Sequence, residues 1–122
     1  MIYSESKLNI CDNSGAKLVK CIKVLNSSKS SGAKPASLVV VSVRKIRLNK
    51  NLIKGQICKG LLVRAKKNIQ RASGISIKFI DNSLILVDQK NLPIASRVIG
   101  PVYKELRLKE YPKVVALAKN VI

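Results

Sequence analysis

Residues 57–80, ICKGLLVRAKKNIQRASGISIKFI, decide the fold that the sequence predicts. The apolar run Ile57 to Val63 leads into a cluster of cations from Arg64 to Arg71, which ends at the turn signal Ala72-Ser73-Gly74. From Ile75 to Ile80, apolar residues alternate with Ser and Lys, as they do in a half-buried strand. These residues therefore predict two strands joined by a basic hairpin tip.

Further strand signals lie on both sides of this stretch, each bounded by Gly, Asn, Ser or Pro. Strands are predicted over Lys17 to Leu25, Leu38 to Leu48 and Leu84 to Asp88. The last is expected to form a hairpin with the strand from Ile75 to Ile80. Residues 26–35 predict a loop. Five short strands at this spacing are typical of a small barrel or sandwich, so the predicted class is mainly β.

Turn and helix signals frame the strands. Asp12 to Gly15 predicts a tight turn in which Gly15 adopts a positive φ. After Gly100-Pro101, helix formers predict two short helices, over Tyr103 to Tyr111 and Lys113 to Ala118, with Pro112 in the first turn of the second.

The length of the chain indicates the number of domains, and its charge indicates the class of partner. One domain is expected over residues 1–122, with a helical region from about residue 103. The formal net charge is +18, and no acid occurs among residues 13–80, which hold sixteen Lys and Arg. A solvated surface normally mixes both signs, so this stretch predicts a face that binds a polyanion. Nucleic acid is the first candidate.

Aromatic residues are too few for single-strand binding by stacking, since the chain has only three Tyr and one Phe. A surface that reads the shape and phosphates of folded RNA fits this composition better. Two rival functions are kept. One is a basic β-barrel that binds nucleic acid transiently, such as a chaperone or translation factor, and the other is an extracellular polyanion binder. Three unpaired cysteines and the lack of a signal peptide oppose the second.

Catalysis, metal binding and membrane insertion are not expected. The chain has no His, and Cys11, Cys21 and Cys58 are too scattered for a zinc site, so they predict buried free thiols. No phosphate-binding Gly-rich loop or clustered carboxylates occur, so neither an enzyme nor a cofactor or small-molecule substrate is predicted. The longest apolar runs fall far short of the roughly 20 residues that a membrane-spanning helix needs.

Blocks of sequence over the whole chain resemble the universal large-subunit ribosomal protein L-fourteen family, of the bacterial and organellar type. The blocks are Asp12 to Ala16, Cys21 to Leu25, Gly60 to Val63, Ser73-Gly74, Phe79, Asn82, Gly100 to Val102 and Glu105 to Arg107. The resemblance implies a five-stranded β-barrel with a projecting basic β-ribbon and a small C-terminal helical region.

The same resemblance implies a function. It is that of a structural constituent of the large ribosomal subunit, bound to large-subunit rRNA. One surface is implied to lie at the subunit interface, in bridges to small-subunit rRNA and beside a neighbouring large-subunit protein. In the resembled family, a silencing or anti-association factor can cover that same surface. The sequence departs from the family's Gly-Asp at Ala36-Ser37, from its acid at Gln56, and from its Pro-Glu at Lys119-Asn120.

Charge clustering and family position together select nine RNA-contact residues. The contacts expected on the ribbon are Arg64, Lys66, Lys67 and Arg71, and those beside the Asp12 turn are Lys17 and Lys20. The contacts that bracket Gly100-Pro101 are Arg97, Lys104 and Arg107, and we expect them at the subunit interface or bridge.

Composition also bears on the compartment. Lys is three times as common as Arg, and the chain holds 14 Ile and 9 Asn, which indicates an AT-rich coding sequence. The resemblance begins at Met1 without a presequence, which favours synthesis where the ribosome works. The mitochondrial matrix is therefore preferred, with the bacterial cytoplasm and the plastid as alternatives.

Overall fold

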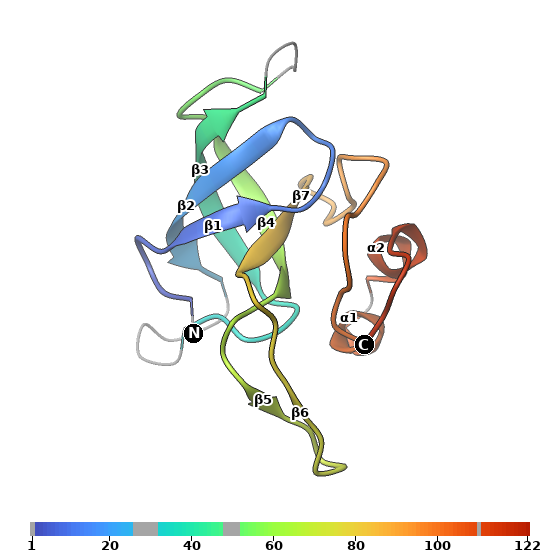
Figure 1. The fold of residues 1–122 in the computed structure, drawn as a ribbon. Helices are drawn as coiled ribbons and strands as arrows, with labels where there is room; N and C mark the ends of the chain where they lie inside the picture. Colours follow the sequence, from blue (N-terminus) through green and yellow to red (C-terminus); the bar gives the residue numbers. More distant parts are fainter. Residues whose placement is uncertain (1, 26–31, 48–51, 110) are drawn as a thin grey trace.

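A computed structural model describes residues 2–25, 32–47, 52–109 and 111–122 (Figure 1). The elements of this part of the chain are β1 (Lys7–Ile10), β2 (Ala16–Val24), β3 (Leu38–Ile46), β4 (Ile57–Arg64), β5 (Ile69–Gln70), β6 (Ser76–Ile77), β7 (Ser83–Val87), α1 (Glu105–Leu108) and α2 (Pro112–Leu117). Five strands close into a barrel, while β5 and β6 form a ribbon that projects from it. The predicted mainly β class, the barrel and the two short C-terminal helices are confirmed.

The barrel closes through its first and last strands. The order is β1-β2-β3-β4-β7, and β1 and β7 are the pair that runs parallel, with Asn9 opposite Ser83 and Ile10 opposite Leu84. The other neighbours pair antiparallel. Closure leaves these five strands without a free sheet edge, which would otherwise be open to unwanted pairing.

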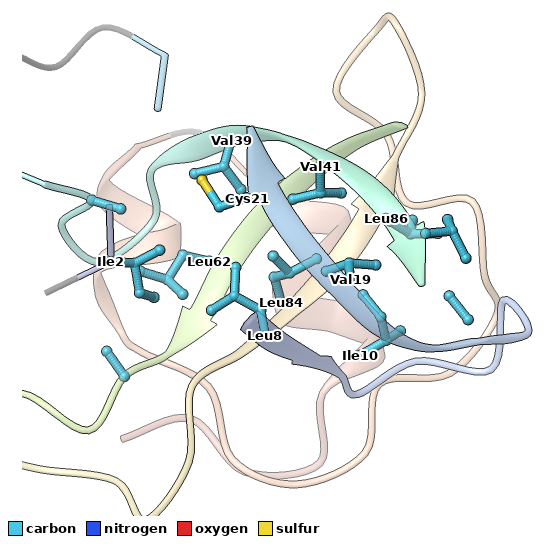
Figure 2. Packing of buried hydrophobic residues seen from close by; sticks show 14 of the residues in the cluster. Ile2, Leu8, Ile10, Val19, Cys21, Val39, Val41, Leu62, Leu84 and Leu86 are labelled. Atoms are coloured by element: carbon cyan, nitrogen blue, oxygen red, sulfur yellow. The ribbon is translucent and has the colours of Figure 1, made fainter. Parts of the chain in front are cut away.

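The interior of the barrel is filled by alternate residues of its strands (Figure 2). In β1, for example, Leu8 and Ile10 are buried while Lys7 and Asn9 are exposed, the two-residue period of a strand with one face in water. The labelled interior side chains are Ile2, Leu8, Ile10, Val19, Cys21, Val39, Val41, Leu62, Leu84 and Leu86.

A second apolar cluster lies between the barrel and the C-terminal region. Its strand residues are Leu61, Val63, Ile85 and Val87, and its C-terminal residues include Val98, Val102, Leu106 and Val114. All five residues of β7 are buried because one face points into the barrel and the other is covered by this region. The C-terminal region with its two helices therefore covers the outer face of β4 and β7.

Two strand predictions were wrong. Strand β1 was missed, because the period-two alternation of Lys7–Ile10 extends over only four residues. The predicted strand from Ile75 to Ile80 reduces to Ser76–Ile77, and it pairs with β5 instead of β7. Ile75 is 61% exposed and Ile80 is 94% exposed, so only Ile77 and the partly buried Phe79 of this alternation pack against the core. β7 pairs with β4 and β1 instead.

The predicted turns and helix starts are better matched. Gly15 has a φ of 109°, and the N–H of Ser14 donates to Asp12 Oδ1 at 3.1 Å, as in an Asx turn. Asp12 is buried, and its Oδ2 is satisfied by the N–H of Leu86, which donates to it at 3.0 Å. Pro112 opens α2 as predicted. Residues 26–31 of the predicted loop and Leu48 of the strand predicted over Leu38 to Leu48 lie outside the described residues.

Three departures from the resembled family have local structural consequences. Ser37 Oγ accepts the N–H of Lys34 at 3.0 Å, and Gln56 Oε1 accepts the N–H of Ile53 at 3.2 Å. Both replacements thus provide the turn acceptor that an acid would provide, without its negative charge. Ala36 sits at φ 61°, a conformation that glycine adopts without strain, while its buried methyl group packs in the second apolar cluster.

Candidate nucleic-acid interface

The root of the ribbon presents two exposed lysines where β4 leaves the barrel. Lys66 and Lys67 are both exposed, and the N–H of Lys66 donates to Asn82 Oδ1 at 2.8 Å. That bond ties the outgoing chain to the returning one, because Asn82 immediately precedes β7. The two lysine side chains therefore project from a fixed backbone at the base of the ribbon.

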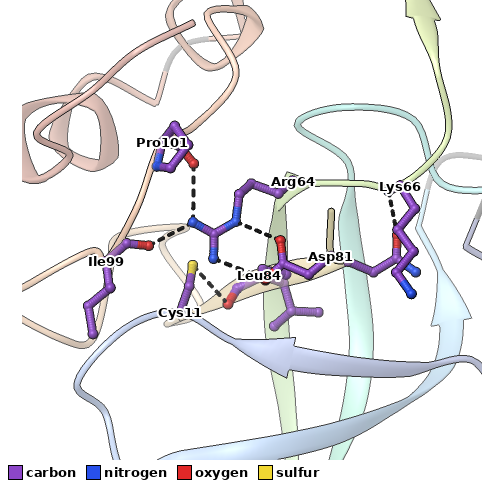
Figure 3. A network of polar contacts seen from close by, with 9 residues as sticks. Cys11, Arg64, Lys66, Asp81, Leu84, Ile99 and Pro101 are labelled. Atoms are coloured by element: carbon purple, nitrogen blue, oxygen red, sulfur yellow. Dashed lines mark hydrogen bonds and ion pairs between the residues drawn. The ribbon is translucent and has the colours of Figure 1, made fainter. Parts of the chain in front are cut away.

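Arg64 lies beside these lysines in the sequence but is buried, with 9% of the residue exposed. Its guanidinium is held between two parts of the chain (Figure 3). On the barrel side, Nε pairs with Asp81 Oδ1 at 3.2 Å and Nη2 donates to Ser83 Oγ at 3.2 Å. On the C-terminal side, Nη1 donates to the carbonyl oxygens of Ile99 at 2.8 Å and Pro101 at 3.4 Å.

This geometry gives Arg64 a structural role. A guanidinium has five N–H donors in a fixed fork, and here the fork joins the end of β4 to residues 99–101. Gly100 has a φ of 87°, and a Cβ at this position would overlap Arg64 Nη1. The pairing register shifts between Leu62 and Arg64, which is an irregularity that sequence patterns do not reveal. Because each guanidinium nitrogen has a partner within the protein, Arg64 is not available as a phosphate contact in this structure.

Arg71 anchors the ribbon to the C-terminal region. Its Nε and Nη2 donate to the two carboxylate oxygens of Glu105 at 2.8 and 3.0 Å, and Nη2 also donates to the main-chain oxygen of Ile122 at 2.6 Å. Burial acts to raise the pKa of Glu105, but its hydrogen bonds and the charges of Arg71 and Lys104 outweigh burial, so this pKa lies below its ordinary value of 4.5. A bidentate pair of this kind fixes orientation as well as charge.

Replacing Glu105 by Gln is expected to destabilise the folded chain modestly at neutral pH, by about 1 kcal/mol, because one partner of a partly exposed charged pair is neutralised. A carboxyl whose pKa is lowered by folding stabilises the folded state above its unfolded pKa, and this contribution is lost as the pH falls through the folded pKa. Urea unfolding at pH 7 and pH 3 checks this. The difference between wild type and Glu105→Gln should shrink at pH 3, and an equal difference at both values would contradict the assignment.

The other predicted cations are distributed over two regions. Lys17 is exposed and Lys20 is half-buried on β2, where Lys20 lies opposite Lys7 of β1. Arg97, Lys104 and Arg107 are exposed in the C-terminal region. The described structure thus does not gather all nine predicted residues on one site.

A cavity of about 690 Å³, here called the Arg97 cavity, brings Arg97 together with two cations that the sequence did not select. It is lined by Asn13, Arg47, Arg97, Val98, Ile99, Gly100 and Lys119. Asn13 Oδ1 accepts the N–H groups of Ser96 and Arg97, each at 3.1 Å, so the Asp12 turn positions Arg97. Arg47 and Lys119 are 72 positions apart in sequence, and only the fold shows that they line the same cavity.

The cysteines show no sign of a metal or redox centre in the described residues. All three are free, and burial raises the pKa of Cys11 to about 12, so its thiol is held in the unreactive protonated form. No group of three or more His, Cys, Asp or Glu in this part of the chain is arranged to hold a metal ion. Neither described helix has the length and apolar character that a membrane crossing requires.

One protein family matches this sequence over its whole printed length. Residues 1–122 match the family described as ribosomal protein L14p/L23e, which confirms the resemblance carried by the sequence blocks from Asp12 to Arg107. Members of this family are structural rather than enzymatic proteins. The chain belongs to the ribosomal protein L14p/L23e family and is thereby a structural constituent of the large ribosomal subunit.

Proposed function

We propose that the protein binds large-subunit rRNA through the root of its ribbon, with Lys66 and Lys67 as the central phosphate contacts. The observation that carries this proposal is the exposure of both lysines within a stretch of 68 residues that contains no acid. Among the described residues, ion pairs join only Arg64 to Asp81 and Arg71 to Glu105, so both lysines are available to an external anion. Release of counterions from neutralised phosphates supplies the affinity.

Lys17 and Lys20 extend the same proposal to β2. They follow the Asp12 turn, whose Ser14 N–H is already engaged by the Asp12 carboxylate. The N–H of Ser14 is therefore not free to bind an external anion. The two lysine side chains are the proposed phosphate contacts here, and their weaker clustering predicts a smaller contribution than that of the ribbon root.

A second basic surface supports contacts between the ribosomal subunits. The Arg97 cavity contributes Arg47, Arg97 and Lys119, and Lys104 and Arg107 are exposed at α1. We assign this surface to the subunit interface, including a bridge to small-subunit rRNA. Arginine favours such a role because its planar fork matches phosphate geometry.

Exposed apolar side chains of the C-terminal region support contacts with protein partners as well. Leu108 is 77% exposed, Ile99 is 56% exposed and Ile94 is 54% exposed. Large apolar groups in water beside cations suit a neighbouring large-subunit protein, or a silencing or anti-association factor that covers the same surface. By contrast, Val114 is fully buried, and Val115 and Leu117 pack against the same apolar cluster. This part of α2 therefore packs against the barrel and is not available to a partner.

The proposed compartment is the mitochondrial matrix, with the bacterial cytoplasm and the plastid as alternatives. The excess of 18 Lys over 6 Arg, together with 14 Ile, supports an AT-rich coding sequence. Cell fractionation discriminates among the three compartments, because the chain should be recovered with the large ribosomal subunits of only one of them.

Sedimentation of a lysate on sucrose gradients tests the proposed function. The protein should co-migrate with the large subunit and remain there through a high-salt wash, because a protein embedded in rRNA dissociates slowly. Free migration, or loss during the wash, would favour the rival of a basic barrel that binds nucleic acid transiently.

A further inference from the structure

A second cavity, distinct from the Arg97 cavity, lies at the base of the ribbon. It has a volume of about 200 Å³ and is here called the ribbon cleft; it is lined by Ala33, Lys34, Pro35, Ala65, Lys67, Asn68 and Ile69. One wall comes from the segment that precedes β3, and the other comes from the chain between β4 and β5. Its lining residues all belong to the acid-free stretch of the sequence.

Backbone hydrogen bonds hold both walls of the ribbon cleft. The N–H of Ala33 donates to the carbonyl of Ile2 at 2.7 Å, and the carbonyl of Ala65 accepts the N–H of Phe79 at 3.2 Å. Ala33 and Ala65 are 3% and 5% exposed, so they form a floor that is continuous with the barrel core. The cleft is therefore part of the folded barrel and does not depend on surface side chains alone.

The chemistry of the ribbon cleft differs from that of a simple phosphate site. Ala33 and Ala65 form its apolar floor, and Pro35 and Ile69 add apolar lining to the walls. Asn68 is the uncharged polar residue of the lining. Lys34 and Lys67 are both exposed, and they contribute a cation from each wall. A phosphate alone gains nothing from apolar walls, and an apolar protein side chain gains nothing from two flanking cations.

A nucleotide matches both the apolar lining and the two cations, because its base is planar and its phosphates are negatively charged. RNA loops and bulges present unstacked bases that proteins receive in shaped sites, with hydrogen bonds to the base edge. The cleft is smaller than the roughly 300–1,000 Å³ of sites for drug-sized ligands, which suits one planar group. We propose, building on the proposed rRNA function, that the ribbon cleft receives one unstacked base of large-subunit rRNA. Asn68 then faces the base edge, and Lys34 and Lys67 contact the flanking phosphates.

Chemical probing of rRNA in assembled large subunits tests this inference. In Ile69→Ala subunits one nucleotide should become roughly tenfold more reactive, because the base loses an apolar wall of its site. Ile75→Ala is the matched control, since Ile75 is an exposed isoleucine of the same ribbon that does not line the cleft. It should leave the reactivity of that nucleotide unchanged.

A second measurement needs no variant. Ultraviolet cross-linking of wild-type subunits should attach that same nucleotide to a peptide spanning residues 33–35 or 65–69, because the nucleobase is the photoreactive group. Subunits that contain the protein but show neither the cross-link nor the change in reactivity would overturn the ribbon-cleft inference alone. Absence of the chain from large subunits would overturn both this inference and the proposed function.

Discussion

Replacing Arg64 by alanine is expected to lower the free energy of unfolding by about 3 kcal/mol. The change removes the charged partner of the Asp81 carboxylate and the donor shared by the buried Ser83 hydroxyl and two partly buried carbonyls. The Arg64 side chain is 11% exposed and that of Asp81 is 31% exposed, so this estimate lies at the lower end of the range for broken buried pairs. Urea unfolding measures the loss as a shift in midpoint at constant slope.

Two comparisons isolate the structural role of Arg64. Lys67→Ala removes a cation three positions away, on an exposed side chain, and should change stability by less than about 0.5 kcal/mol. Gly100→Ala retains the arginine but places a Cβ against its Nη1, so it should destabilise in the same direction as Arg64→Ala. A cost below about 1 kcal/mol for Arg64→Ala would contradict the buried network and return Arg64 to the phosphate contacts.

The double replacement Lys66→Glu and Lys67→Glu is expected to weaken binding to large-subunit rRNA roughly 100-fold at moderate salt, because two phosphate contacts become repulsive. Incorporation of the variant into large subunits should fail. Its unfolding free energy should remain close to that of the wild type, since both side chains are exposed. Filter binding and gradient sedimentation measure the two effects.

The control for this variant is Lys54→Glu with Lys90→Glu. These two lysines are exposed in the turns before β4 and after β7 and lie outside the proposed interface, and their replacement changes the net charge by the same amount. A small effect in the control and a large one at Lys66 and Lys67 would assign binding to the ribbon root. Equal losses in both variants would mean that overall charge, rather than this site, determines affinity.

Much of the barrel was predictable because its strands carry local signals. β2, β3, β4 and β7 appear in the sequence as runs rich in Val, Ile and Leu between turn residues, and Pro112 marks the start of α2. Strand pairing was less predictable. β1 is held by its long-range partners β2 and β7, and so four residues of local pattern carry too little information.

The candidate interface was predictable in its charge but not in the orientation of each side chain. Lys66 and Lys67 are exposed as expected, whereas Arg64, in the same cluster, turns inward at an irregularity in the β4 pairing. A signal for this was present, since Asp81 is the first acid after 68 residues without one. Arg47 and Lys119 could not be paired with Arg97 from sequence, because only the closed fold places them around one cavity.

The salt dependence of rRNA binding tests the central claim most directly. Affinity for large-subunit rRNA is measured over a range of salt concentrations for the wild type and for Lys66→Ala with Lys67→Ala. The slope of log affinity against log salt should fall in magnitude by roughly 1.5–2, which corresponds to the loss of two phosphate contacts. An unchanged slope would show that these lysines do not contact phosphates and would contradict an rRNA interface at the root of the ribbon.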